Sequence, residues 1–427
     1  MSNQYAILRQ KGLAKRYRAE RRFRLFGLAA LFSAIFILAL LLGSIIYNSI
    51  PAFTQGDITL SVYLDAEKID PQGTRSEAVL RGANYNALWR AGLYEMLSSE
   101  KLSRRDKRAA GKLISSGAGS ILASHVIKNP HLIGENIRFT FPLSGDANQF
   151  IKGFISEETA EDDRRLTDKQ IGYMRLLQEK GAVKNGFALP LFLNGDSREP
   201  ELAGIRGALQ GSILTMLVTL LMSFPLGVLA AIYLQELAPR NRFTDLIEVN
   251  INNLAAVPSI VFGLLGLGIF LNFFGMPRSA PLVGGMVLAL MTLPTIIIAT
   301  RIAIASVPPS IREAALGMGA SKMQVIFHHV LPLAMPGILT GTIIGIARAM
   351  GETAPLLMVG MLAFVVDPPT GFTSSATVLP AQIYMWADNP ETAFQAKTSA
   401  AIIILLAVLI CMNALAIWLR NRYERRW

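Results

Sequence analysis

The sequence contains one cysteine, Cys411, and four histidines among its 427 residues. A single thiol excludes an intrachain disulfide and a cysteine-rich metal site. The nucleotide-binding P-loop, G-x-x-x-x-G-K-[ST], is also missing, and the nearest glycine–lysine run, GMGASK, has the wrong spacing. We therefore expect no metal ion and no cofactor in this chain, and no ATP bound through a P-loop.

Acidic residues are outnumbered, with 30 Asp and Glu against 41 Lys and Arg, which gives a net charge of +11. Much of the excess lies in two tails, residues 1–24 and 421–427, and each tail adjoins a long apolar segment. This is the pattern of the positive-inside rule, so we expect both tails to be cytoplasmic. The same placement argues against nucleic acid as the partner of the basic charge.

Apolar residues make up 52% of the chain and the mean hydropathy is +0.40, which predicts several membrane spans. About 20 apolar residues are needed to cross a bilayer. The segments that reach this length are 25–47, 208–234, 254–274, 282–305, 337–366 and 398–419. The first is too long for a signal peptide and lacks an A-x-A-like cleavage site after it, so we interpret it as an uncleaved anchor.

Six spans would place both tails on one side of the membrane, and the short loops agree with this arrangement. The loops expected inside carry Arg240, Arg242, Arg312 and Lys322, and those expected outside carry Arg278 and Lys397. The predicted fold class is therefore an all-α polytopic membrane protein with six transmembrane helices. We expect a multi-pass protein of the bacterial cytoplasmic (inner) membrane.

Residues 48–206 differ in composition and contain no apolar run of spanning length. The alternation in ITLSVYL predicts a strand, and residues 76–99 and 157–181 have apolar spacing typical of helices. We predict an α+β soluble insert on the external face, between the first two spans. Its basic run KLSRRDKRAAGK is interpreted as a solvated helix face. No catalytic motif is found in the insert, and its role stays open.

The segment 306–336 separates the fourth and fifth spans and has consistent helix signals. Ser310 with Glu313 and Ser321 with Gln324 predict two capping boxes, and Gly317 and Gly319 interrupt the helix between them. Pro332 is predicted to end the second helix. One apolar stripe is expected along that helix, formed by Met323, Ile326, Phe327, Val330 and Leu331. Such a face needs a cover, which could be lipid, the spans or another protein.

This segment resembles the EAA loop of the permease subunits of ABC importers. The resemblance rests on Glu313-Ala314-Ala315, Gly319 and Leu331-Pro332 at the family's spacing, while His329 stands where the family usually has isoleucine. It implies that the loop is a coupling helix that docks on a separate cytoplasmic ATPase, with ATP and Mg²⁺ bound there. An ordinary interfacial helix pair is the alternative.

Residues 207–420 resemble the PstA-type permeases of phosphate importers, through TLPTIIIATRIAIASVPPSIREAALGMGASK, IARAMGETAPLL and NNLAAVPSIVFGLLGLGIF. The resemblance covers about half of the chain. It implies a non-catalytic membrane subunit that works with a second homologous permease, an ATPase dimer and an external phosphate-binding protein. The insert departs from shorter members of the family, which have a brief first external loop.

Arg348 and Glu352 lie one helical turn apart in the predicted fifth span, where a charge is costly and marks function by default. Counted from Gly337, Arg348 would lie near mid-bilayer. Gly337, Gly341, Gly345 and Ala349 form a stripe of small residues that permits close approach of another helix, so Arg348 is expected to face protein. Its planar fork of donors suits phosphate oxygens, and Glu352 can neutralise it at rest. The alternative is a buried ion pair that holds two helices together.

Arg301 is a second candidate for the substrate path, although it could equally be a snorkelling residue that sets topology. The EAA-like loop does not choose the substrate, so a permease for another oxyanion or small solute remains open. A membrane-anchored sensor or scaffold is a more distant alternative. Whether the pore forms with a second copy of this chain or with a homologue also stays open.

Overall fold

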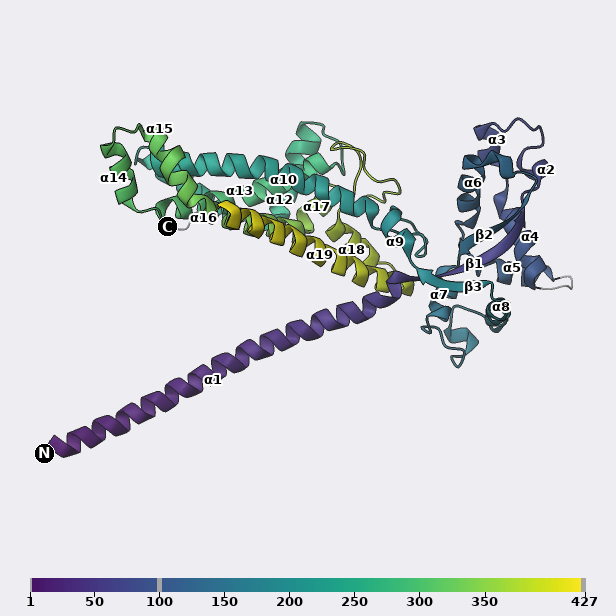
Figure 1. Ribbon diagram of the computed structural model, residues 1–427, viewed down its shortest axis with the longest axis horizontal. Coiled ribbons are helices and arrows are strands. Elements are labelled where there is room, and N and C mark those ends of the chain that lie inside the picture. The colour runs from purple at the N-terminus through teal and green to yellow at the C-terminus, as the bar shows by residue number, and fades with distance from the viewer. Residues whose placement is uncertain (1, 98–101, 424–427) are drawn as a thin grey trace.

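The computed structural model describes residues 2–97 and 102–423, in which helices predominate. Figure 1 shows a long helical bundle with a small mixed domain, here called the insert domain, at one end. The bundle consists of α10 (Arg206–Ile232), α11 (Arg242–Ala255), α12 (Ser259–Gly266), α13 (Pro281–Ala305), α14 (Pro309–Gly317), α15 (Lys322–Gln324), α16 (Leu331–Gly351), α17 (Ala354–Met358), α18 (Leu379–Ala387) and α19 (Thr392–Tyr423), with the π-helical segments η4 (Tyr233–Leu237), η5 (Leu267–Phe273) and η6 (Val325–Val330). The first helix, α1 (Ser2–Ser49), meets the start of α19 and from there projects away from the bundle (Figure 1).

The insert domain lies between α1 and α10. Its strands are β1 (Thr54–Tyr63), β2 (Asn136–Pro142) and β3 (Val183–Phe187). Its helices are α2 (Ala66–Ile69), α3 (Glu77–Gly82), α4 (Tyr85–Leu97), α5 (Arg104–Gly111), α6 (Ala118–Lys128), α7 (Gly145–Ile151), α8 (Asp168–Glu179) and α9 (Leu189–Leu193), with the 3₁₀ turns η1 (Ile50–Phe53), η2 (Pro130–Leu132) and η3 (Glu161–Asp163).

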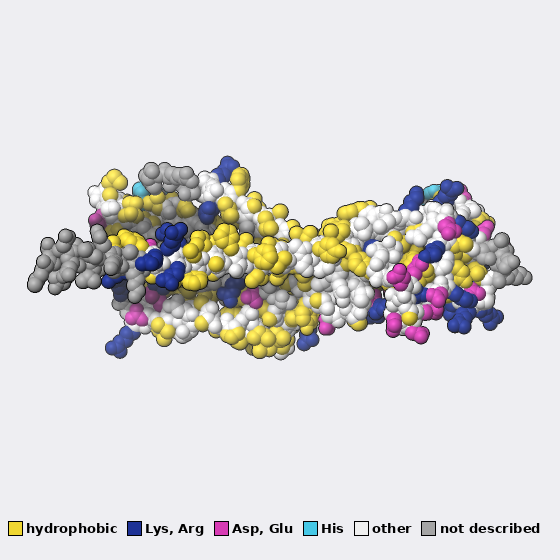
Figure 2. Space-filling model, turned by 90° about the horizontal axis from the view of Figure 1, so that it is seen from below, with side chains coloured by type: hydrophobic (Ala, Val, Ile, Leu, Met, Phe, Trp, Pro, Cys, Tyr) yellow, Lys and Arg dark blue, Asp and Glu magenta, His cyan; other side chains and the backbone are white. Residues whose placement is uncertain are grey.

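In the described part of the chain, five helices are long and apolar enough to cross a membrane, or six if one bent pair counts as a span. The five are Arg16–Phe53, Arg206–Leu237, Pro281–Ala305, Lys322–Gly351 and Thr392–Arg422. The start of α1 and the end of α19 both lie on the side away from the insert domain, although α1 diverges from the bundle (Figure 1). Figure 2 shows a hydrophobic band along α1 with Lys and Arg side chains near one end of it.

Two of the expected spans differ from the structure. The segment 254–274 is the second half of a bent pair, Arg242–Ala255 and Ser259–Phe273, whose axes meet at 102°. Pro258 lies at the bend, where it disfavours helical geometry in the residue before it. The expected span 337–366 is displaced toward the N-terminus, because its helix runs from Lys322 and ends at Gly351.

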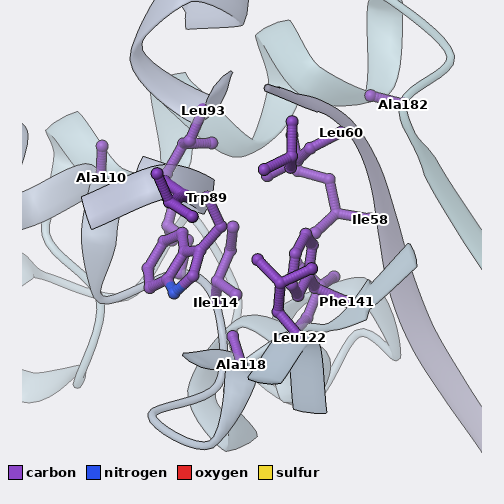
Figure 3. Packing of buried hydrophobic residues seen from close by; sticks show 14 of the residues in the cluster. Ile58, Leu60, Trp89, Leu93, Ala110, Ile114, Ala118, Leu122, Phe141 and Ala182 are labelled. Carbon is purple, nitrogen blue, oxygen red and sulfur yellow. The ribbon is translucent and has the colours of Figure 1, made fainter. Parts of the chain in front are cut away.

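The insert domain has its own hydrophobic core, built on one face of an antiparallel sheet with strand order β2-β1-β3. Alternate residues of β1, Ile58, Leu60 and Val62, are fully buried against the helices. Trp89 of α4 and Phe141 of β2 are among the largest side chains in this core, and they meet with their ring centroids 6.3 Å apart (Figure 3). An α+β domain was expected here, and the strand predicted from ITLSVYL is confirmed.

Both helices expected in the insert domain are shorter than predicted. The segment 76–99 is split between α3 and α4, because Ala83 after Gly82 adopts an extended conformation, and residues 98 and 99 lie outside the described residues. In 157–181 the helix begins only at Asp168, after a complete capping box of Thr167 and Gln170. The described part of KLSRRDKRAAGK forms α5, which is mostly solvent-exposed.

Three charged side chains meet where the insert domain joins the bundle. Lys152, which follows α7, donates from Nζ to the carbonyl of Pro51 at 2.6 Å, and Lys397 of α19 donates to the carbonyl of Ala203. Glu201 lies between them around a small cavity and is only 2% exposed. Neither of its carboxylate oxygens has a hydrogen-bond partner of normal geometry among the described residues, although Ser115 lies beside it.

Burial raises the pKa of the Glu201 carboxyl above its ordinary value, because a charged carboxylate is poorly solvated there. The same effect lowers the pKa of Lys152 to about 8. A carboxyl whose pKa is raised in the folded state stabilises the fold fully below its unfolded pKa, and this contribution is lost as the pH rises through the folded pKa.

We therefore expect Glu201→Gln to unfold like the wild type near pH 4, below the ordinary pKa of a glutamate, and to be more stable at pH 8, by about 1–3 kcal/mol, because the buried charge is removed. Thermal unfolding of the purified protein at both pH values measures this difference. Glu179→Gln, at the exposed end of α8, is the matched control and should show no such pH dependence. A less stable Glu201→Gln protein at pH 8 would instead mean that the two lysines hold Glu201 as an ion.

Candidate functional site

The loop between α13 and α16, here called the docking loop (residues 306–330), lies at the end of the bundle opposite the insert domain (Figure 1). Its first helix, α14, begins at Pro309 with Pro308 as the N-cap residue, and no side chain caps it. The expected capping box of Ser310 and Glu313 is therefore wrong, because the helix starts two residues earlier, with Pro308 as its N-cap and Pro309 as its first residue. Gly319, at φ +86°, ends this helix in the left-handed conformation that glycine adopts most readily.

The second capping box is confirmed. Ser321 accepts a hydrogen bond from the backbone of Gln324, and the Gln324 side chain accepts one from the backbone of Ser321. Pro332 does not end this helix, contrary to the prediction, because the π-helical segment η6 precedes it and the helix continues into α16. A proline lacks an N–H, and the wider π turn accommodates it without a break.

The π-helical segment also changes which residues of the docking loop are buried. Ile326 and Val330 lie in a hydrophobic cluster at the end of α13, as the predicted stripe requires, and Val325 joins them. Met323 and Phe327, predicted on the same stripe, are exposed. Together with Leu316 and Met318 of the preceding turn, they form an apolar surface that nothing in the described chain covers.

The residues of the EAA-like pattern divide between this surface and its support. Glu313 and Ala314 are exposed, whereas Ala315 is buried against the bundle. Leu331 and Pro332 are half-buried at the start of α16. One side of the docking loop is therefore exposed, and the other side packs against the bundle.

Arg312 fixes the docking loop to two bundle helices, a role that the sequence did not reveal. Its Nη2 lies 2.8 Å from Oε1 of Glu236, in η4 at the end of α10, and also donates to the carbonyl of Ile304 at 2.9 Å. Its Nη1 donates to the carbonyl of Val307 at 2.6 Å. One guanidinium therefore joins α14 to the ends of both α10 and α13, so a displacement of the loop is transmitted to these helices.

Arg348 lies in the last turn of α16, not mid-helix, because the helix begins well before Gly337 and ends at Gly351. Its Nε is 3.6 Å from Oε1 of Glu352, which has left the helix in an extended conformation. The Arg348 side chain is 55% exposed and that of Glu352 is 22% exposed. A cation in the final turn is favoured by the helix dipole. The pair is therefore open on one side.

The stripe of small residues on α16 faces α13. A Cβ at Gly341 would lie 2.1 Å from the Cβ of Ala299, and one at Gly337 would lie 2.7 Å from that of Ala303. Gly345 is looser, since a Cβ there would meet only Ile296 and Thr295 at ordinary contact distances. Arg348 lies on the neighbouring face of α16, where its side chain is exposed in the described part of the chain, so the expectation that it faces protein would require another chain.

Arg301 lies on α13 and is paired with Glu248 of α11, with Nη2 2.6 Å from Oε1. Both side chains are partly buried. The contacts of Gly341 with Ala299 and of Gly345 with Ile296 set α13 and α16 antiparallel, which places Arg301 roughly 13 Å from Arg348 along the helix axes. The structure therefore does not bring the two candidate arginines together within one chain.

The bundle, the docking loop and the exposed ion pair define a multi-pass membrane subunit of a transport system. The profile of the family described as "Binding-protein-dependent transport system inner membrane component" matches residues 203–427, more than half of the chain. The chain belongs to this family. A second profile, "Domain of unknown function (DUF3333)", matches residues 10–161 and thus α1 and most of the insert domain.

Curated relatives agree with this assignment. The chain is 33% identical over 231 residues to the "Probable ABC transporter permease protein YqgI" of Bacillus subtilis, covering 51% of this chain and 77% of that protein. It is 32% identical over 234 residues to the "Phosphate transport system permease protein PstA 1" of Mycobacterium tuberculosis H37Rv (55% and 75%), and 30% identical over 230 residues to PstA of Haemophilus influenzae (53% and 79%). Within its family, the chain is a PstA-type permease subunit of an ABC importer.

Among solved structures, the chain matches the inward-facing MetNI methionine ABC transporter at 17% identity and a TM-score of 0.39, over 52% of this chain and 96% of that chain. A bacterial alginate ABC transporter is 17% identical with a TM-score of 0.40, over 50% of this chain and 77% of that chain.

The contact between α16 and α13 gives a prediction. Gly341→Ala should destabilise the bundle by about 1–3 kcal/mol, because its new methyl group would overlap Ala299 unless the helices move apart. Gly345→Ala is the matched control and should be tolerated, since its Cβ meets only ordinary contacts. Thermal unfolding in detergent compares the two variants, and equal melting temperatures would contradict this packing.

Proposed function

We propose that this chain is the transmembrane subunit of an ATP-driven importer of inorganic phosphate. The names of its PstA relatives support phosphate as the substrate. The observation that carries the proposal is the placement of Arg348, a half-exposed arginine in the last turn of a membrane helix, with Glu352 as its ion-pair partner at 3.6 Å.

Arg348 lies in the last turn of a span, where an arginine reaches water or headgroups rather than the apolar centre of the bilayer. Its uncovered face would then line a water-filled translocation path between two permease subunits. A guanidinium presents a planar fork of donors that matches a tetrahedral oxyanion. Glu352 would neutralise it when no anion is present.

The docking loop supplies the coupling. Its exposed apolar side, with Glu313, Ala314 and Gly319, would bind a separate ATPase that holds ATP and Mg²⁺. Arg312 joins this loop to the ends of α10 and α13, so movement on the ATPase would shift these helices. The chain itself would catalyse no covalent chemistry and hold no cofactor, in keeping with its lack of a P-loop.

The complete importer would contain a second homologous permease, an ATPase dimer and an external phosphate-binding protein. If the bent pair α11–α12 counts as a sixth span, both tails lie on the cytoplasmic side and the insert domain lies outside, in the periplasm of a Gram-negative cell. This arrangement places the docking loop on the same side as the ATPase.

A permease for another oxyanion or small solute is the second candidate. It is favoured by the similarity to YqgI, whose name states no substrate, and by a docking loop that does not select one. A gene for a phosphate-binding protein next to this one would favour phosphate. A membrane-anchored sensor is a weaker candidate, because a sensor needs neither the docking loop nor an arginine in the last turn of a span.

We expect Arg348→Lys to reduce phosphate uptake at least about 10-fold, because lysine keeps the charge but loses the two-pronged donor geometry worth roughly 1.5–3 kcal/mol. Uptake of labelled phosphate by a deletion strain complemented with each variant measures this. Arg301→Lys is the matched control, since Arg301 is already paired with Glu248. Wild-type uptake by the Arg348→Lys strain, at equal protein levels, would overturn the role of Arg348.

Glu352→Gln tests selectivity. Phosphate retains a proton near neutral pH, which an ionised carboxylate can accept as a hydrogen bond, whereas sulfate has none to give. The variant should therefore admit sulfate more readily and narrow the preference for phosphate. Competition of labelled phosphate uptake by unlabelled sulfate measures the preference, and an unchanged ratio together with an unchanged rate would contradict the hypothesis.

A further inference from the structure

An apolar patch lies where the insert domain meets the bundle, and neither the docking loop nor the ion pairs account for it. It consists of Phe187, at the end of β3, and Leu189, Phe192 and Leu193 of α9, which are 60%, 58%, 38% and 60% exposed. The five residues of α9, LPLFL, include no polar side chain. A contiguous apolar surface of this kind on a folded protein marks a contact.

The patch is continuous with a membrane span. The ring of Phe192 stacks on that of Phe53 at 6.2 Å and on that of Phe187 at 5.7 Å. Phe53 is the last residue of the candidate span Arg16–Phe53. The aromatic stack therefore begins where α1 leaves the membrane.

The other side of α9 is fixed to the bundle. Leu191 is fully buried in a cluster with Ala400 and Ala401 of α19. The backbone of Ala188 donates to the carbonyl of Phe53 at 2.9 Å, and Ile205, just before α10, donates to that of Leu191 at 2.8 Å. The segment is thus held in place between three span ends, as its position in Figure 1 indicates.

The length of α1 indicates where Phe53 lies relative to a bilayer. Its apolar residues 25–47 make about 34 Å of helix, which fits a hydrocarbon core of about 30 Å when the helix is tilted. Tyr47 then lies at the boundary, where tyrosine is favoured, and Phe53 lies about one turn and a half farther, in the headgroup layer. The patch adjoins Phe53 through the ring of Phe192.

The charged side chains around the patch are those expected in the headgroup layer of a membrane. Phe187, Leu189 and Leu193 line an open groove of about 700 Å³, and the guanidinium of Arg198 lies 5.9 Å from the ring centre of Phe364 on the groove wall. Arg206 also lines the groove, as does Asp367. Groups of both signs beside an apolar surface match zwitterionic lipid headgroups, with arginine near the phosphates.

We propose that Phe187, Leu189, Phe192 and Leu193 insert into the headgroup layer of the membrane, on the side of the membrane where the insert domain lies. Lipid covers the patch. This contact sets the distance and the tilt of the insert domain relative to the bundle. This inference depends on the chain being a membrane protein and is independent of the transported substrate.

The test uses spin labels in the assembled importer, reconstituted in nanodiscs of phosphatidylcholine and phosphatidylglycerol. The native Cys411 is first replaced by serine, and single cysteines are then introduced as Leu189→Cys or Leu193→Cys. Two exposed positions serve as controls, Ile410→Cys on the apolar surface of α19 and Tyr63→Cys at the far end of β1. Collision with oxygen reports lipid, and collision with a water-soluble nickel chelate reports water.

Labels at 189 and 193 should collide with the nickel chelate several-fold less than the label at 63, and with oxygen more, approaching the label at 410. Nickel accessibility equal to that at position 63 would place the patch in water and overturn the proposal. Low accessibility to both reagents in the complex, but not in the isolated chain, would mean that a second protein covers the patch and would overturn it as well.

Discussion

Helix α13 makes the contacts on which the rest of the bundle depends. At Gly285 a Cβ would lie 2.5 Å from Val218 of α10, and at Gly341 of α16 one would lie 2.1 Å from Ala299, so both neighbours approach α13 at backbone distance. Inside a membrane, where lipid is as apolar as a leucine side chain, such close packing is the main source of helix association. The ion pairs of Arg301, Arg312 and Arg348 are all placed by helices that pack on α13 or end beside it.

Three of the ion pairs described above, Arg301–Glu248, Arg312–Glu236 and Arg348–Glu352, differ in length and in exposure. Arg301–Glu248 and Arg312–Glu236 are short, at 2.6 and 2.8 Å, and partly buried, so they hold helices together. Arg348–Glu352 is longer, at 3.6 Å, with a half-exposed arginine that a competing anion can reach. The sequence predicted this third pair because its members lie four residues apart. It could not predict Glu248 or Glu236 as partners, because these pairs span 53 and 76 residues and form only in the folded bundle.

Several local signals predicted the structure correctly, although the capping box at Ser310 is wrong. The capping box at Ser321, the helix end at Gly319 and the strand in residues 58–64 are confirmed. Predictions failed where a π turn or a bend changed the course of a helix, because hydropathy and helical spacing do not predict either feature. The π turn before Pro332 carried the helix past a proline, and it rotated Met323 and Phe327 out of the stripe that regular helical spacing predicts. The bend at Pro258 shortened a span that hydropathy alone extended.

The π-helical segment η4 ends α10, and η6 lies within the docking loop, just before α16. A π turn holds one residue more than an α turn, and passing that residue along the helix advances everything beyond it by roughly 1.5 Å and 100°. Each of the two segments therefore holds one residue of spare length, one at the end of α10 and one at the entry to α16.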